Sequence, residues 1–227
     1  MKKVGIIGGM GPESTAIFYL KIIEKFQKKY NFRFDHEYPE ILIHNNPIPD
    51  PVDSMDNEKV LSMCMKSVDI LNRFGADIIA IPCNTVGTLI EDIRKNTQAK
   101  VFCIASDVLK YAKNNGFRKL GILATKTTIR EKYYKNLAEN LGIVLIEPSK
   151  EEMIKINDIV YRILSGIKDE NDKKVLVAIS KRMINLGADA IIIGCTDLPL
   201  LINDNDDEIR YIDSLDVLAD VVMNNSF

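Results

Sequence analysis

Two stretches of the chain, 112 positions apart, have nearly the same sequence, and this repeat constrains the fold more than any other feature. Residues 72–85 read Asn-Arg-Phe-Gly-Ala-Asp-Ile-Ile-Ala-Ile-Pro-Cys-Asn-Thr, and residues 184–196 read Ile-Asn-Leu-Gly-Ala-Asp-Ala-Ile-Ile-Ile-Gly-Cys-Thr. Each stretch contains a short apolar run, typical of a buried parallel strand, and then a cysteine. The repeat therefore predicts two related halves, each with one thiol, Cys83 or Cys195, at the end of a buried strand.

Short apolar runs alternate with amphipathic segments along the rest of the chain, which is typical of βαβ units and parallel sheets. The expected strands are 4–7, 41–44, 78–81, 101–104, 120–124, 144–146, 190–193 and 210–212. We therefore predict an α/β protein with two pseudo-symmetric domains, residues 1–104 with 210–227 and residues 105–209. We expect the last helix to return to the first half. Because ligands of such sheets bind at the carboxyl ends of strands, the predicted active site is the cleft between the domains.

The composition argues against several classes of partner. The 227 residues carry a net charge of −2 and include no Trp, so nothing favours nucleic acid or a membrane surface. The first apolar run stops at Gly8-Gly9 without a cleavage-site pattern, and no run approaches the ~20 residues of a membrane span. We expect a cytoplasmic protein whose four cysteines are reduced.

The repeated cysteines are the candidate catalytic groups. Cys83 precedes a helix expected to begin near Thr85, and the field of a helix N-terminus favours the thiolate. Cys195 has a similar setting, with Asp197 placed to orient the thiol or to accept a proton. Two thiols in equivalent positions suggest acid/base chemistry on opposite faces of one substrate, and racemisation is the simplest such reaction.

Other roles for cysteine stay open at this point. Either repeated cysteine could be a small buried apolar residue, or the two could form a disulfide. No metal site is predicted, because Cys-x-x-Cys is absent and the two histidines do not cluster with the repeated cysteines. Cys64 and Cys103 are expected in the core.

The loops after the first strand of each half are candidate anion-binding segments. In the first, the third glycine of a dinucleotide motif is replaced by Ser14, which argues against NAD and an oxidoreductase. The backbone N–H groups of Met10 and Gly11 can still face a carboxylate. In the second half, Thr125 and Thr127 either cap the next helix or bind substrate.

Four motifs together resemble the aspartate/glutamate racemase family, in particular its aspartate racemase branch. They are Gly-Gly-Met-Gly-Pro-Glu-Ser-Thr at 8–15, Pro-Cys-Asn-Thr at 82–85, Leu-Ala-Thr at 123–125 and Gly-Cys-Thr-Asp-Leu-Pro-Leu-Leu at 194–201. The resemblance implies two flavodoxin-like domains, a homodimer, an amino-acid substrate, and catalysis without pyridoxal phosphate or metal. It also implies that one cysteine thiolate removes the α-proton while the other thiol delivers a proton from the opposite face.

The resemblance also suggests which residues hold the substrate. Lys168 falls where aspartate racemases carry a lysine for the side-chain carboxylate, and Asp197 supports Cys195. The predicted substrate-binding residues are Met10, Gly11, Asn46, Asn84, Thr85, Thr125, Thr127, Lys168 and Thr196.

Three departures from the family pattern bear on the substrate. Pro51 stands where aspartate racemases usually have an arginine, and lysine is no equivalent bidentate partner for a carboxylate. Val86-Gly87 replaces Ala-His, and Asp197 is one methylene shorter than the usual Glu. The expected substrate is therefore aspartate or glutamate, with the preferred side chain open. The alternatives are a maleate cis-trans isomerase, a decarboxylase, or a dicarboxylate-binding protein without turnover.

Overall fold

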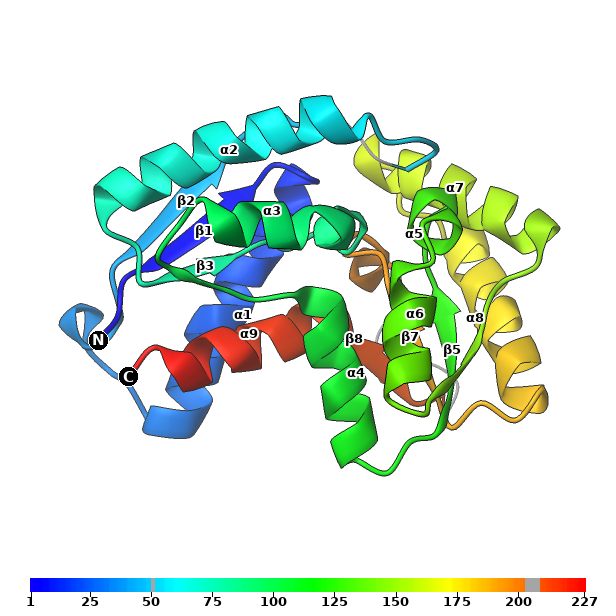
Figure 1. Ribbon diagram of the computed structural model, residues 1–227. Helices are drawn as coiled ribbons and strands as arrows, with labels where there is room; N and C mark the ends of the chain where they lie inside the picture. Colours follow the sequence, from blue (N-terminus) through cyan, green and yellow to red (C-terminus); the bar gives the residue numbers. More distant parts are fainter. Residues whose placement is uncertain (50–51, 203–208) are drawn as a thin grey trace. The chain divides into compact units, whose positions relative to one another are not determined.

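The computed structural model describes residues 1–49, 52–202 and 209–227, which form two compact units (Figure 1). The first unit comprises residues 1–49, 55–104 and 215–227. The second comprises residues 52–54, 105–202 and 209–214. Each unit contains one four-stranded parallel sheet with helices on its faces, as the sequence predicts.

In the first unit the strand order is β2-β1-β3-β4, and all neighbours are parallel. Right-handed crossovers place α1 and α2 on opposite faces of this sheet (Figure 1). Its elements are β1 (Val4–Gly8), α1 (Pro12–Tyr30), η1 (Asp35–Glu37), β2 (Ile41–Asn45), α2 (Asn57–Phe74), β3 (Ile78–Ala80), η2 (Thr85–Leu89), α3 (Ile90–Lys95), β4 (Lys100–Val101) and α9 (Ser214–Asn225).

The second unit repeats this topology with the strand order β6-β5-β7-β8, again all parallel. The central strand β5 therefore corresponds to β1, and β7 to β3. Its elements are α4 (Ile104–Asn114), β5 (Lys119–Leu123), α5 (Lys126–Arg130), α6 (Tyr133–Asn140), β6 (Val144–Ile146), α7 (Lys150–Leu164), α8 (Glu170–Asn185), β7 (Ala190–Ile193), η3 (Leu198–Leu200) and β8 (Tyr211–Asp213).

The two units exchange their last helices. Helix α4 follows β4 of the first sheet but belongs to the second unit from Ala105 onward, and α9 follows β8 but belongs to the first unit from Leu215. On α1, the Lys25 Nζ atom holds α9 through Asp216 and Asp220, at 2.7 and 2.8 Å. From Leu215 onward, the last helix therefore lies in the first unit.

The division differs from the expected domain boundaries at two places. Residues 210–214 lie in the second unit, because β8 pairs with β7 through Ile191 and Tyr211. Residues 52–54 also lie there, although the flanking chain is in the first unit. Val52 is buried in the second core, and the Asp53 Oδ1 atom accepts a hydrogen bond from Asn157 Nδ2 at 2.8 Å.

The repeated Gly-Ala-Asp sequence has a structural role that the sequence analysis did not assign. The Asp77 Oδ2 atom accepts a hydrogen bond from Lys3 N at 2.7 Å, at the start of β1. In the second unit, Asp189 Oδ2 accepts from Arg118 N and Lys119 N at 2.7 and 2.8 Å, at the start of β5. These backbone hydrogen bonds lower the pKa of Asp189. Each aspartate therefore ties the start of one central strand to its neighbour.

Helices α7 and α8 begin earlier than the apolar spacing predicts, because polar residues cap them. Ser149 Oγ accepts from Glu152 N, and Asp169 accepts from Asn171 N. Apolar spacing alone indicates starts at Asn157 and Val175. The first turns are polar, so hydrophobic periodicity alone misses them.

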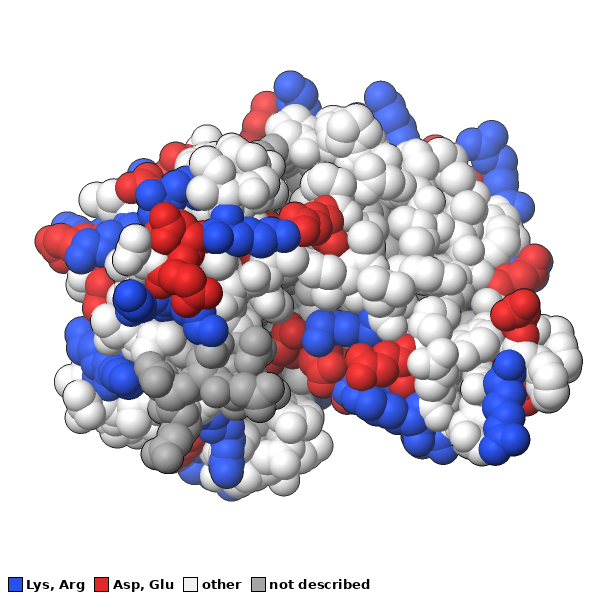
Figure 2. All heavy atoms as spheres, turned by 180° about the vertical axis from the view of Figure 1, so that it is seen from behind, with Lys and Arg blue, Asp and Glu red and all other residues white. Residues whose placement is uncertain are grey.

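The structure agrees with the sequence on charge and hydrophobicity. On the face shown in Figure 2, acidic and basic side chains lie next to one another rather than in separate patches of one sign. Within the described part of the chain, every helix is too short or too polar to span a bilayer.

Candidate functional site

The carboxyl edge of the first sheet gathers most of the residues predicted to bind substrate. Met10 and Gly11 follow β1, Asn46 follows β2, and the Cys83-Asn84-Thr85 stretch follows β3. Because β2, β1 and β3 are parallel neighbours, their ends lie at one edge of the sheet. All six residues are buried or nearly so, which is unusual for Asn and Thr and points to hydrogen-bonded positions.

The loop after β1 is built by close backbone approach. Gly9 has φ +96°, and a Cβ atom there would lie 1.9 Å from the Asn46 carbonyl oxygen, so only glycine fits. Gly9 N donates to Thr15 Oγ1 at 3.1 Å, and Thr15 Oγ1 donates to Gly11 O at 2.8 Å. The Met10–Gly11 peptide bond is cis. This network fixes the loop at the start of α1.

Cys83 is buried beside a second thiol of the same unit. Burial and, to a lesser degree, the charge of Cys83 raise the pKa of Cys64 to about 12. Cys64 on α2 therefore stays protonated at neutral pH. Cys64 and Cys103 are both buried, as expected for core residues.

At the carboxyl edge of the second sheet, Cys195 lies beside a carboxylate. Its Sγ atom is 3.9 Å from Asp197 Oδ2, within reach of a weak S–H···O hydrogen bond. Gly194 N donates to Leu123 O at 2.8 Å, so the ends of β7 and β5 are joined. Cys195, Thr196 and Thr125 consequently follow adjacent strand ends.

The two thiols differ in the helix that follows them. Cys83 precedes an unbroken helical stretch made of η2 and α3, as predicted, although its first part is a 3-10 helix. Cys195 precedes only the single turn η3. The expectation of a comparable helix field at Cys195 is therefore not met, and the nearby polar group there is the Asp197 carboxylate.

The threonines of the second unit are already engaged within it. Thr125 is the N-cap of α5 and accepts from Thr128 N at 3.4 Å. Thr127 Oγ1 donates to Val52 O at 3.0 Å, so its hydroxyl proton holds the 52–54 segment. Lys168 is exposed in the loop between α7 and α8. The substrate roles predicted for Thr125, Thr127 and Lys168 stay predictions.

Two polar residues that were not predicted from the sequence, Ser67 and His44, support Asn46. The Asn46 Nδ2 atom donates to Ser67 Oγ, which also lies 2.9 Å from His44 Nδ1. Ser67 lies inside α2 and His44 inside β2. A buried serine in an otherwise apolar helical face was the available signal.

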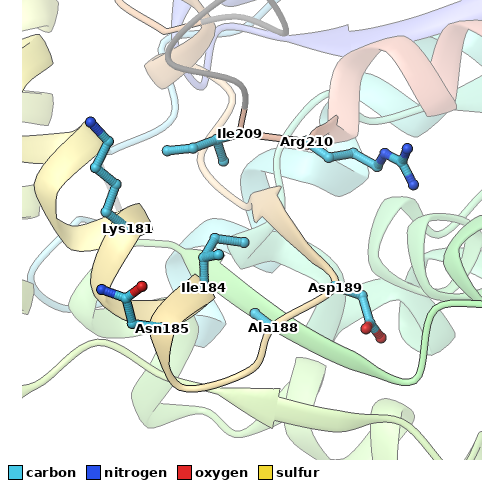
Figure 3. Close-up of a pocket in the computed structure, with 7 residues that line it drawn as sticks. All are labelled: Lys181, Ile184, Asn185, Ala188, Asp189, Ile209 and Arg210. Atoms are coloured by element: carbon cyan, nitrogen blue, oxygen red, sulfur yellow. The ribbon is translucent and has the colours of Figure 1, made fainter.

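Two of the surface pockets formed by the described residues lie at the amino edges of the sheets, opposite the carboxyl edges. The larger, of about 590 Å³, is formed by the end of α8 and the residues just before β7 and β8 (Figure 3). Ala188 and Asp189, which line it, precede β7, whereas Cys195 follows it. A four-residue strand is roughly 13 Å long, so this pocket and the candidate site are at different ends of β7.

The fold is a duplicated α/β architecture with one thiol after an equivalent central strand of each sheet. Residues 7–222 match the sequence profile described as Asp/Glu/Hydantoin racemase. The chain belongs to this family of racemases, which are isomerases. The predicted family and enzyme class are therefore confirmed.

Individual relatives agree with this assignment. The chain is 29% identical over 220 residues to the broad specificity amino-acid racemase RacX of Bacillus subtilis (strain 168), covering 95% of this chain and 94% of RacX. An aspartate racemase homologue from Pyrococcus horikoshii OT3 superposes with a TM-score of 0.83 at 29% identity, covering 100% of this chain and 99% of the homologue.

The likeness to more distant structures shows the fold alone. Glutamate racemase from Campylobacter jejuni subsp. jejuni has a TM-score of 0.68 at 21% identity, covering 98% of this chain and 85% of that protein. The predicted fold of two α/β units is confirmed by these likenesses together with the two parallel sheets.

Proposed function

We propose that the protein is a cofactor-independent amino-acid racemase in which Cys83 and Cys195 exchange the roles of base and acid. The observation that carries the proposal is the equivalent placement of the two buried thiols. One follows the central strand β3, and the other follows its counterpart β7. A single structural cysteine would not need to recur in both halves of a duplicated chain.

In the proposed reaction, one cysteine thiolate takes the α-proton and becomes a thiol. The other cysteine, protonated at that moment, delivers its proton to the opposite face of the α-carbon and becomes the thiolate. Proton transfer by a positioned group contributes roughly 10²- to 10⁴-fold to rate. Hydrogen-bond donors from Met10, Gly11 and Asn84, together with the Thr85 and Thr196 hydroxyls, would stabilise the carbanion-like charge.

Asp197 has a defined part in this scheme. Its carboxylate, 3.9 Å from Cys195 Sγ, can orient the thiol and stabilise its protonated form. Thr125 and Thr127 are proposed to contact the α-carboxylate or the amine. Lys168 is proposed to pair with a side-chain carboxylate.

Aspartate and glutamate are the proposed first substrates, and the range is to be tested more widely. RacX is described as having broad specificity, and Pro51 replaces the arginine expected for an acidic side chain. The test is proton NMR in D₂O under reducing conditions, with both enantiomers of acidic, neutral and basic amino acids. Loss of the α-proton signal, with chiral chromatography detecting both enantiomers, is the expected result for at least one substrate.

The cysteine variants test the mechanism. Cys83→Ser and Cys195→Ser should each lower racemisation by at least about 10³-fold, because each removes one of the two proton carriers. Cys64→Ala and Cys103→Ala are the matched controls, since both replace buried cysteines of the first unit. Racemisation retained in either active-site variant would eliminate the two-base mechanism.

Absence of α-proton exchange across the whole panel would favour the alternatives. Maleate and substituted malonates would then distinguish a cis-trans isomerase or a decarboxylase from a dicarboxylate-binding protein without turnover. The Pro51 and Gly87 departures are the observations that favour the binding protein.

We further propose that the protein is a cytoplasmic homodimer. The mechanism needs free thiols, and a reducing compartment maintains them. Sedimentation equilibrium would give the mass of the assembly, and a monomer at assay concentration would exclude the dimer.

A further inference from the structure

The Asn46 side chain is anchored to helix α2 through its amide nitrogen. The Nδ2 atom donates to Met63 O at 2.9 Å and to Ser67 Oγ at 3.2 Å. Both amide hydrogens are therefore used within the first unit. Asn46 is only 8% exposed, so neither bond competes freely with bulk water.

These partners fix which end of the carboxamide faces α2. A backbone carbonyl can only accept a hydrogen bond, so the reverse orientation would place Asn46 Oδ1 against Met63 O, two acceptors together. Ser67 is itself fully buried and lies 2.9 Å from His44 Nδ1 and 3.4 Å from Met63 O. The carbonyl oxygen Oδ1 is consequently the end that is turned away from α2.

The main chain of Asn46 is held equally closely. Its N–H donates to Gly8 O at 3.2 Å, and its carbonyl oxygen packs where a side chain at Gly9 would otherwise lie. Asn46 is thereby fixed at the end of β2, beside the loop that follows β1. Parallel strands are about 4.8 Å apart, so β2 and β3 are separated by roughly 10 Å, a span that an amino acid over β1 can bridge.

The oxygen is available as an acceptor. Among the residues that the structure describes, the hydrogen bonds made by the Asn46 side chain are the two from Nδ2. An amide oxygen with unused lone pairs suits an N–H donor and repels a carboxylate.

We propose that Asn46 recognises a nitrogen of the substrate, with Oδ1 accepting a hydrogen bond from an ammonium N–H, and that Ser67 is the positioning residue that fixes this orientation. The proposal rests on the racemase function proposed above. The donor is either the α-ammonium group, common to all substrates, or the ammonium of a basic side chain, and the experiment separates the two.

The test compares binding of paired ligands that differ only in the amino group. Aspartate is paired with succinate and alanine with propionate, for the α-ammonium, and lysine is paired with norleucine, for the side-chain ammonium. Titration calorimetry gives the dissociation constants for the wild-type protein and for Asn46→Leu. A hydrogen bond to a charged group predicts about 10- to 100-fold weaker binding of the ligands that carry the recognised ammonium, with less than about twofold change for those that lack it.

Ser67→Ala tests the positioning role and keeps the proposal open to refutation if Asn46→Leu does not fold. We expect KM to rise about 3- to 10-fold with a smaller change in kcat. Ser180→Ala is the matched control, because Ser180 is also fully buried in a helix and bonds the carbonyl four residues earlier, Leu176 O, at 2.9 Å. The control should leave both constants unchanged.

If Asn46→Leu weakens the binding of both aspartate and alanine, the contact is to the α-ammonium. If it weakens only the binding of lysine, the contact is to the side-chain ammonium. Equal losses for both members of each pair would overturn the proposal. The proposal would also be overturned if Asn46→Leu weakened the binding of acidic ligands alone, or if Ser180→Ala raised KM as much as Ser67→Ala does. Wild-type α-proton exchange in D₂O is measured separately, so failure of the racemase function is distinguished from failure of the Asn46 role.

Discussion

The two units have the same strand order but build the loop after their first strand by different means. In the first unit, Gly9 brings its backbone against the backbone of Asn46, and a Cβ atom at Gly8 would lie 2.4 Å from Thr15 Cγ2. In the second unit, Ala124 is followed by Thr125, whose hydroxyl caps α5. The first loop thus offers main-chain N–H groups, and the second offers hydroxyls.

The surroundings of the two repeated cysteines also differ between the units. Cys83 lies beside a buried, protonated Cys64 and precedes a long helical stretch. Cys195 lies beside the Asp197 carboxylate and precedes one turn. Duplication has preserved the position of the thiol while the groups around it have diverged. Under the proposed mechanism, the two proton transfers are therefore chemically unequal, and variants of the two units should behave differently.

The largest expected effect on stability concerns the glycine-built loop. Gly9→Ala combines a positive φ with a Cβ atom 1.9 Å from Asn46 O, so we expect a loss of about 2 to 5 kcal/mol in the free energy of unfolding. Gly75→Ala is the matched control, because Gly75 has φ +77° but its Cβ would meet no atom within 4 Å. For Gly75→Ala, the free energy of unfolding should fall by about 1 to 2 kcal/mol. Urea unfolding measures both, and equal losses would contradict the importance of close backbone approach.

A smaller effect, on catalysis, should separate the two thiols. Asp197→Asn removes the charge beside Cys195, and we expect kcat/KM to fall about tenfold. Because enantiomers have equal free energies in an achiral solvent, kcat/KM must fall by the same factor in both directions. The difference between the Cys83 and Cys195 steps should appear instead in the isotope effects measured with α-deuterated L and D substrates.

The direction of those isotope effects follows from which thiol is slowed. When Cys195 removes the deuteron, its slower step becomes more rate-limiting and the isotope effect rises. When Cys83 removes the deuteron, the later delivery by Cys195 limits the rate and the isotope effect falls. Parallel changes in both directions would argue that Asp197 does not act through Cys195.

The internal repeat predicted the topology because a buried parallel strand is a continuous apolar run with its own end signal. It also predicted the places of Cys83 and Cys195, since both cysteines follow such runs. The supporting residues were harder to predict. Ser67 is marked only as a polar residue in an otherwise apolar helical face, and His44 carries no local pattern. The contacts of Ser67 with Asn46 and His44 form only when α2 packs on the sheet.

The boundary between the two units near residue 210 could not be predicted from the sequence either. A three-residue strand such as Tyr211–Asp213 can pair with either sheet as far as its sequence is concerned. Its place is decided by the ladder with β7. Likewise, Val52 is buried in a core cluster whose other members come from distant parts of the chain, including α7 and α8.

The smallest expected effect compares two surface carboxylates, one in each unit, whose pKa values are both lowered for different reasons. Burial raises the pKa of Asp216, but the hydrogen bond and charge of Lys25 outweigh it and hold the pKa below its ordinary value. The pKa of Asp189 is lowered by backbone N–H groups of Arg118 and Lys119. In both cases the native state favours the charged form. Each carboxylate therefore stabilises the fold above the unfolded pKa of about 3.9, and this contribution is lost as pH falls through the folded value.

Salt should distinguish the two, because an ion pair is screened and a hydrogen bond to a backbone N–H is affected less. The Asp216 side chain is 41% exposed, so Asp216→Asn should cost less than about 1 kcal/mol near pH 7, and this cost should vanish once the pH falls below the lowered pKa of the folded state. At about 1 M salt most of that cost should disappear. The cost of Asp189→Asn should persist, since its partners are main-chain amides. Urea unfolding of both variants at low and high salt makes the comparison. An equal salt dependence would mean that the ion pairs with Lys25 and Lys21 are not what stabilises Asp216.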